Sequence, residues 1–183
     1  MRKNFTESEI ASHTAYKGRL LTVKEDHVRL PDGAKAMREY VEHQGAVMVL
    51  PLFEDFSVLL EHQFRYPLRA HTLELPAGKI DPGEATLDTA KRELLEETGY
   101  VAGEWSFMSA VYPCVGYSNE KVELFLARDL RFEGHPGEEG EFIQTVQVAL
   151  DAALEMVRRG EISDVKTMLG LLWAEKIRRG EWA

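Results

Sequence analysis

The chain has 183 residues, of which 44% are hydrophobic and 29% charged, and its formal net charge is −9. This length predicts one domain, or one domain with a modest additional arm. The acidic balance argues against a nucleic-acid partner, because phosphate binding needs clustered Lys and Arg. No apolar run reaches the roughly 18 residues of a membrane helix, so we expect no membrane association. Cys114 is the only cysteine, which excludes an internal disulfide and fits a cytoplasmic protein.

The first half of the chain is predicted to be mostly strands. Residues 19–30 form a strand, the turn Pro31-Asp32-Gly33 follows, and residues 36–43 form its hairpin partner. The continuous apolar run 45–53 predicts a buried strand. After a turn at Glu54-Asp55, residues 56–65 are expected to return as the second arm of another hairpin, and 71–78 begin as a short strand.

The second half alternates strands and helices. Apolar residues recur at helical spacing between 85 and 98, so this segment is predicted to be an amphipathic helix that ends at Gly99. Strands are expected at 104–113, 121–130 and 142–150, with a polar loop at 131–141. Two helices close the chain, 151–159 with Asp151 as N-cap and 164–178 with Ser163 or Asp164 as N-cap. The predicted fold class is mixed α+β, with helices packed on a sheet.

The predicted helix 85–98 carries a crowded acidic edge. Glu93, Glu96 and Glu97 are one, three and four positions apart, so they gather on one side of the helix. Like charges at this spacing cost a few tenths of a kcal/mol each, and Arg92 offsets only part of that cost. A solvated acidic face is one interpretation. The alternative is a cation site, because these carboxylates and the backbone carbonyls of the preceding "ELPAG" suit Mg²⁺ or Mn²⁺.

The same stretch resembles the signature of the Nudix hydrolases. That signature runs Gly, five residues, Glu, seven residues, Arg-Glu, an aliphatic residue, any residue, Glu-Glu, any residue, Gly and an aliphatic residue. The matching positions are Gly78, Glu84, Arg92, Glu93, Leu94, Glu96, Glu97 and Gly99. Only Tyr100 departs, being aromatic where an aliphatic residue is usual, which is a change in packing and not in chemistry.

The similarity extends over most of the chain. "EHQFRYPLRAHTLELPAGKIDPGE", "YPCVGYSNEKVELFLARDL" and "GEISDVKTMLGLL" resemble the branch that acts on ADP-ribose and nucleoside diphosphate sugars. The resemblance implies an α/β/α Nudix sandwich with a mixed sheet for residues 45–183. It also implies that residues 1–44 are a β-rich N-terminal arm that pairs with a second subunit, so that the protein is a homodimer.

The resemblance implies a divalent-metal site for Mg²⁺, with Mn²⁺ as a substitute. The implied metal ligands are the Ala77 carbonyl, Glu93, Glu96, Glu97 and Glu141. Arg92 would orient the carboxylates through charge-assisted hydrogen bonds. Glu84 would either reach a metal through water or brace the loop by an ion pair.

A general base is implied in the acidic loop at 135–141. In the resembling branch the base lies after the signature, and here Glu139 and Glu141 match a Glu-x-Glu before a hydrophobic residue. Glu139 is the expected base and Glu141 a metal or water ligand, with the two roles interchangeable. From the sequence alone, such a loop is more often a solvated one.

Four further residues are candidates for substrate contacts. Arg65 matches an arginine that contacts phosphate or the terminal sugar, although a surface ion pair is the alternative. Glu74 resembles a substrate residue next to the signature, and Glu120 one at the sugar end of the pocket. Tyr117, or else Phe64, would stack on the base or sugar, although an aromatic residue is more often part of a core.

One departure bears on specificity. ADP-ribose hydrolases of this branch carry a proline where this chain has Val115. We therefore expect hydrolysis of the pyrophosphate bond of several nucleoside diphosphate sugars, such as ADP-ribose or GDP-mannose. An ADP-ribose-specific pyrophosphatase is the enzymatic alternative, and a sensor that binds a nucleotide sugar without cleaving it is the non-enzymatic one.

Overall fold

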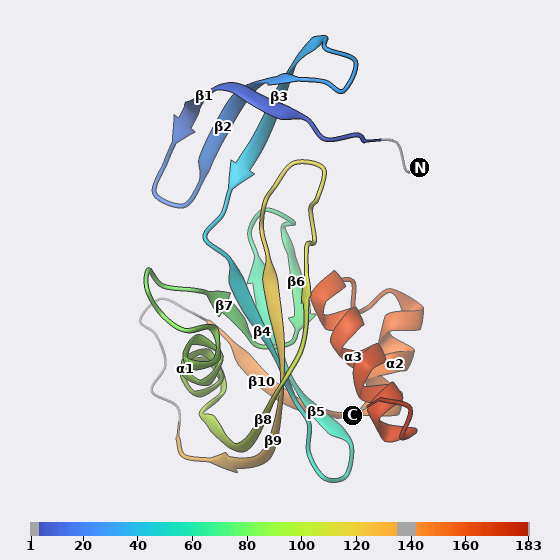
Figure 1. Cartoon of the computed structure of the whole chain (residues 1–183). Helices are drawn as coiled ribbons and strands as arrows, with labels where there is room; N and C mark the ends of the chain where they lie inside the picture. The colour runs from blue at the N-terminus through green and yellow to red at the C-terminus, as the bar shows by residue number, and fades with distance from the viewer. Residues whose placement is uncertain (1–3, 135–141, 183) are drawn as a thin grey trace. The chain divides into compact units, whose positions relative to one another are not determined.

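The computed structural model describes residues 4–134 and 142–182, and Figure 1 traces the chain. The chain divides into two compact units, Met1–Gln44 with Tyr112–Lys121 and Gly45–Val111 with Val122–Ala183. The first unit takes in a segment, 112–121, that the sequence did not assign to it. Glu139 and Glu141, the expected base and ligand, lie outside the described residues.

The first unit is a three-stranded antiparallel sheet. Its strands β1 (Ser8–Lys17), β2 (Thr22–Arg29) and β3 (Lys35–Glu42) are adjacent in chain order. The predicted hairpin of β2 and β3 is confirmed, and its turn is closed by the Asp32 carboxylate, which accepts the Ala34 N–H at 2.9 Å. The segment 112–121 joins β3 through the Val41 N–H, which donates to the Tyr117 carbonyl at 2.8 Å.

Strand β1 was not predicted from the sequence. Its ten residues are all exposed, and its pairing with β2 shifts register near Ile10 and again near Ala15. An exposed strand with two bulges carries no alternation of buried and exposed residues, which is the pattern that sequence-based assignment depends on.

The second unit contains two sheets. The first has the order β7-β4-β9-β8 and is mixed, because β4 runs parallel to β9 while the other pairs are antiparallel. The second sheet has the order β10-β5-β6 and is antiparallel. The strands are β4 (Ala46–Pro51), β5 (Ser57–Arg65), β6 (Ala70–Glu74), β7 (Ala77–Lys79), β8 (Tyr100–Val111), β9 (Val122–Phe132) and β10 (Gln144–Ala149).

The predicted hairpin of β4 with β5 is wrong. The two strands belong to different sheets. The chain on either side of the turn is linked by an isolated bridge, Leu52 with Val58, and by the Phe53 N–H, which donates to the Ser57 carbonyl at 2.9 Å. All six residues of β4 are buried, since the strand has a neighbour on each edge and a core on each face. A continuous apolar run is typical of such a central strand.

Helices cover both sides of β4 (Figure 1). Val47 and Val49 point to helix α1 (Thr86–Thr98), where they share a core with Ala90 and Leu94. Met48 and Leu50 point the other way, into a larger core that includes residues of α2 (Leu150–Arg159) and α3 (Val165–Arg178). The predicted α+β class with helices packed on a mixed sheet is therefore confirmed.

Helix α1 ends as the sequence predicts. Gly99 has the left-handed φ of 74°, and its N–H donates to the Leu95 carbonyl at 2.8 Å. A Cβ added at Gly99 would lie 2.5 Å from the Gly134 carbonyl oxygen, and the Gly99 carbonyl accepts the Glu133 N–H at 2.9 Å. Glycine is required here for both its backbone freedom and its lack of a side chain.

Of the two N-caps predicted for the last two helices, one is confirmed and one is wrong. Asp164 caps α3, accepting the Thr167 N–H at 2.9 Å, as expected. The assignment of Asp151 as a cap is wrong, because α2 begins one residue earlier, after Ala149. Asp151 lies in the first turn and accepts a hydrogen bond from Arg178 at 2.7 Å. None of the described helices has both the length and the hydropathy of a membrane-spanning helix.

Candidate active site

Arg92 is the centre of an ion-pair cluster on α1. Its Nε and Nη2 donate to the two carboxylate oxygens of Glu84, each at 3.0 Å. Its Nη1 donates to both Glu93 and Glu96 at 2.9 Å. The hydrogen bonds to Glu84 are the largest contribution to a raised Arg92 pKa. One guanidinium thus holds three of the acids that the sequence places close together.

Glu84 fixes the loop that leads into α1. Besides Arg92, its carboxylate accepts the Thr89 hydroxyl at 2.8 Å and the Asp81 N–H at 3.3 Å. The Arg92 and Thr89 hydrogen bonds lower the pKa of Glu84 to about 2. These contacts match the loop-bracing alternative for Glu84. A water-mediated role at a metal stays a prediction.

Gly78 allows Glu93 to lie against β7. A Cβ added at Gly78 would overlap the Glu93 carboxylate. The first glycine of the signature is therefore explained by close approach and not by a turn, because its φ is not in the left-handed region.

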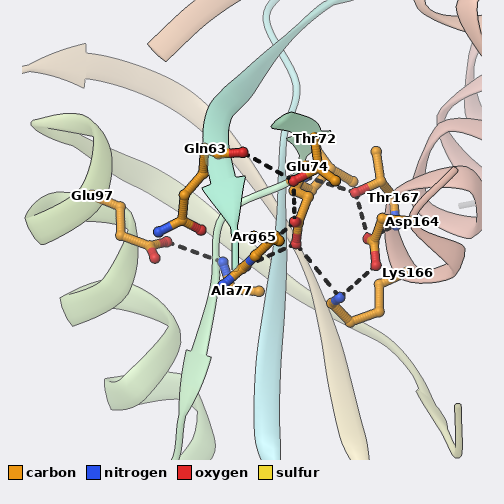
Figure 2. Close-up of polar contacts among 10 residues, drawn as sticks. Gln63, Arg65, Thr72, Glu74, Ala77, Glu97, Asp164, Lys166 and Thr167 are labelled. Atoms are coloured by element: carbon orange, nitrogen blue, oxygen red, sulfur yellow. Dashed lines mark hydrogen bonds and ion pairs between the residues drawn. The ribbon is translucent and has the colours of Figure 1, made fainter. Parts of the chain in front are cut away.

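Glu97 is turned from α1 toward β7. Its carboxylate accepts the Ala77 N–H at 3.0 Å, as Figure 2 shows. Burial, and then the charges of Glu61 and Glu93, raise the pKa of Glu97 to about 10, and a hydrogen bond shared with Glu61 contributes. The helix thus brings Glu97 to the strand that also carries the Ala77 carbonyl.

Glu61 is a further acid that acts on Glu97 and that was not predicted from the sequence. It lies on β5 and is only 3% exposed. An acid directly after the apolar run "FSVLL" was the available signal, because a charge on an otherwise buried strand needs a partner. Its position opposite Glu74 on β6 could not be known without the strand register.

The donor set suits a hard divalent cation. Carboxylates that repel one another, beside a backbone carbonyl, are the oxygen ligands that Mg²⁺ and Mn²⁺ accept. Within 4–134 and 142–182, however, no three His, Cys, Asp or Glu side chains are close enough to hold an ion by themselves. An ion bound here would therefore complete its coordination with the Ala77 carbonyl, water and substrate phosphate, as Mg²⁺ commonly does.

Arg65 and Glu74 form a two-pronged ion pair beside this cluster. Arg65 Nε and Nη2 donate to the two oxygens of Glu74 at 2.7 and 2.8 Å. Glu74 and, more weakly, Glu97 raise the pKa of Arg65. The two predicted substrate residues are thus brought together with the predicted metal ligands of the same unit.

Tyr117 and Glu120 lie in the first unit, on the segment 112–121. The Tyr117 side chain is 61% exposed, and the Phe64 side chain on β5 is 47% exposed, so neither belongs to a core. The Glu120 N–H donates to the Ser118 hydroxyl at 3.1 Å. Val115, the position that departs from the ADP-ribose pattern, is 81% exposed on the same segment.

Comparison with known families gives two matches. Residues 42–168 match the model described as "NUDIX domain", and residues 9–41 match "Nucleoside diphosphate sugar hydrolase N-terminal domain". The second match lies within residues 1–44, the predicted N-terminal arm.

Known relatives cover nearly the whole chain. An ADP-ribose pyrophosphatase of Bacillus subtilis is 36% identical over 94% of this chain and 95% of its own. A methanol dehydrogenase activator of Bacillus methanolicus is 33% identical over 96% of both chains. A crystal structure of an ADP compounds hydrolase superposes with a TM-score of 0.85, covering 98% of each chain at 24% identity. The fold, the signature on α1 and these similarities show that the chain belongs to the Nudix family.

Proposed function

We propose that the protein hydrolyses the pyrophosphate bond of nucleoside diphosphate sugars, with Mg²⁺ or Mn²⁺, to a nucleoside monophosphate and a sugar phosphate. The two relatives described above are of similar identity and carry different names, so overall similarity does not select the reaction. The site carries the proposal. Acids that repel one another converge on Glu97, whose carboxylate accepts the Ala77 N–H, and the charge of Glu97 acts on the cationic Arg65.

The described residues have distinct tasks in this reaction. A bound divalent ion supplies neutralisation of the diphosphate charge and a coordinated water of lowered pKa. Glu93, Glu97 and the Ala77 carbonyl would hold the ion, and water and substrate phosphate would complete its coordination. Glu96 is the further ligand that the sequence resemblance implies, and Arg92 fixes the orientation of Glu93 and Glu96. Arg65 would hold a phosphate oxygen, because a guanidinium matches phosphate geometry.

Three predicted roles complete the proposal from the sequence resemblance. Glu139 removes the proton from the attacking water, and Glu141 holds a metal ion or a water, or the two exchange roles. Tyr117 stacks on the base or sugar, and Glu120 contacts the sugar. A general base must reach the water within hydrogen-bond distance. Replacing whichever of Glu139 and Glu141 is the base by glutamine should therefore stop turnover without loss of substrate binding.

The substrate range is expected to be broad. At position 115, where the pattern of ADP-ribose hydrolases has a proline, this chain has valine. The N-terminal match also names nucleoside diphosphate sugars as a class and not one of its members.

A substrate panel tests the reaction. The purified protein is incubated with ADP-ribose, GDP-mannose and a UDP-sugar, with Mg²⁺ or Mn²⁺, and the nucleoside monophosphate is measured by chromatography. We expect product from more than one substrate and none in excess EDTA. Cleavage of ADP-ribose alone would establish the specific pyrophosphatase instead. Binding without any product would establish the sensor.

We further propose that the protein is a cytoplasmic homodimer joined through the sheet β1-β2-β3. All of β1 is exposed, including the apolar side chains of Ile10 and Tyr16. A three-stranded sheet with an exposed edge strand is a surface on which pairing of chains is favourable. The single cysteine fits the reducing compartment.

A further inference from the structure

The Glu74 carboxylate is fully engaged by other protein groups. It lies on β6 and is 5% exposed. One oxygen accepts from Arg65 Nε and from the Thr72 hydroxyl, both at 2.7 Å, and the other accepts from Arg65 Nη2 at 2.8 Å. Lys166 Nζ lies 3.8 Å from this second oxygen (Figure 2). A substrate hydroxyl would have to displace one of these partners to reach Glu74.

The first turn of α3 holds this part of the chain. Lys166 Nζ is 2.7 Å from Asp164, the residue that caps the helix. The Thr167 hydroxyl donates to Asp164 at 2.7 Å and accepts the Leu75 N–H at 2.8 Å. The helix therefore contacts the side chain of Glu74 and the backbone of the next residue.

The two residues that follow extend this connection to the proposed metal site. The Pro76 carbonyl accepts the Val49 N–H of β4 at 2.8 Å. The Ala77 N–H donates to Glu97 of α1 at 3.0 Å. Leu75 also packs closely on α3, because a Cβ at Gly170 would overlap its side chain. Residues 75–77 are thus tied in turn to α3, β4 and α1.

Arg65 keeps one edge of its guanidinium available. Its Nε and Nη2 are used by Glu74, whereas Nη1 has no acceptor among residues 4–134 and 142–182. Its side chain is 42% exposed, and the charge of Glu97 acts on it. The Arg65 guanidinium is therefore partly exposed and lies within the electrostatic influence of Glu97.

We propose that Glu74, held by Lys166, is a positioning residue that presents the available edge of Arg65 to a substrate phosphate. This inference rests on the proposed function and assigns Glu74 a role different from the direct substrate contact that the sequence resemblance implies. A two-pronged pair fixes the plane of the guanidinium, so the direction of Nη1 is set before the substrate binds. Lys166, four-fifths buried, adds a second cation that keeps the carboxylate ionised and in place.

The first test uses steady-state kinetics on two variants and a matched control. Glu74→Gln keeps the size of the side chain but turns an NH₂ group toward an Arg65 donor. Lys166→Met removes the second cation and keeps the aliphatic stem. Lys176→Met is the control, since Lys176 is on the same helix and its ion pair within the described part of the chain is with exposed Glu181. We expect KM for ADP-ribose to rise about 10-fold in Glu74→Gln and about 3-fold in Lys166→Met, with kcat within about 3-fold. Lys176→Met should match the wild type.

A double-mutant cycle separates positioning from direct contact. If Glu74 acts through Arg65, the double variant Arg65→Lys with Glu74→Gln should have the KM of Arg65→Lys alone. Effects that multiply, to about 100-fold for two 10-fold losses, would mean that Glu74 contacts the substrate itself and would overturn the inference. A lower Tm with unchanged KM in both Glu74→Gln and Lys166→Met would also overturn it, as a purely structural role.

An NMR measurement keeps the inference separate from the catalytic proposal. The Nε–H signal of Arg65, assigned by its loss in Arg65→Lys, should exchange slowly in the wild type and in Lys176→Met. It should broaden or vanish in Glu74→Gln and broaden in Lys166→Met. An unchanged signal in both variants would overturn the inference even in an active enzyme. A wild type that cleaves no nucleotide sugar would instead overturn the proposed function, and this signal would then decide whether Glu74 and Lys166 fix Arg65.

Discussion

Among single residues, Glu97 is the buried acid of raised pKa on which the proposed metal site depends. We expect Glu97→Gln to lower kcat by about three orders of magnitude or more, because a site that loses a metal-holding carboxylate loses most of its electrostatic stabilisation. The amide can still accept the Ala77 N–H, so the fold should persist. The measurements are kcat at saturating Mg²⁺, Mn²⁺ affinity by electron paramagnetic resonance, and Tm.

The control for this prediction lies on the same helix. Asp88→Asn removes an exposed acid in the first turn of α1 and should leave kcat within about 2-fold, as surface changes generally do. If Glu97→Gln kept wild-type turnover and Mn²⁺ affinity, Glu97 would not belong to the metal site.

Stability should depend on pH through the same carboxyl. The folded pKa of Glu97, about 10, lies above its ordinary value of 4.5, so the folded state holds a proton that the unfolded state has lost. The resulting stabilisation is complete below about pH 4.5 and is lost as pH rises toward 10. Without metal, Tm should therefore fall across this window. Acids of lowered pKa, such as Glu84 with a pKa of about 2, change the pH dependence of stability only below pH 4.5.

Metal ions should reverse that trend. Because a divalent ion binds the ionised acids, the rise in Tm on adding Mg²⁺ should grow with pH, and Glu97→Gln should flatten both curves. The measurement is differential scanning calorimetry between pH 5 and 9 in EDTA and in Mg²⁺. A metal-free Tm that rises steadily with pH in the wild type would contradict the assignment.

At the scale of elements, the contact of α1 with β7 depends on Gly78. Gly78→Ala should displace the Glu93 carboxylate, because the new methyl group would overlap it. We expect kcat/KM to fall about 10- to 100-fold, as a displacement of about 1 Å does in other enzymes. Overpacking should also cost about 1–3 kcal/mol of unfolding free energy.

Gly83 serves as the control for Gly78, because a side chain there would strain the backbone without contacting another residue. Gly83 has a φ of 84° and nothing within 4 Å of an added Cβ, so Gly83→Ala should cost about 1 kcal/mol in stability and leave kcat/KM nearly unchanged. Equal losses of activity in the two variants would show that the loss at Gly78 does not arise from contact with Glu93.

The elements also show what the sequence could predict. Helix α1, its end at Gly99 and the Arg92 cluster were predictable because their determinants lie within 23 positions of one another. The pairing of β4 with β9, the exposed strand β1 and the contact of Lys166 with Glu74 were not, because they depend on residues distant in sequence or on a segment with no burial pattern. Glu61 was not predictable for the same reason, because its neighbours in space depend on the register of β5 with β6.

At the scale of the whole molecule, the exposed sheet predicts self-association. Light scattering after size exclusion should give twice the chain mass of 20.8 kDa. The double variant Ile10→Lys with Tyr16→Glu should give the single mass, because charges on an exposed apolar strand oppose pairing of chains. Leu172→Lys, which changes an exposed apolar residue on α3, should remain dimeric. A wild type of single mass at micromolar concentration would refute the dimer.

The absence of a side chain at Gly99 links two distant parts of the chain. This residue follows Glu97 by two positions, and its carbonyl and empty Cβ position meet the backbone of Glu133 and Gly134, directly before the segment that carries the predicted proton acceptor. Residues more than 30 positions apart in the chain therefore meet at Gly99. Any larger residue at position 99 would disturb the end of α1 and the backbone at Gly134 at once.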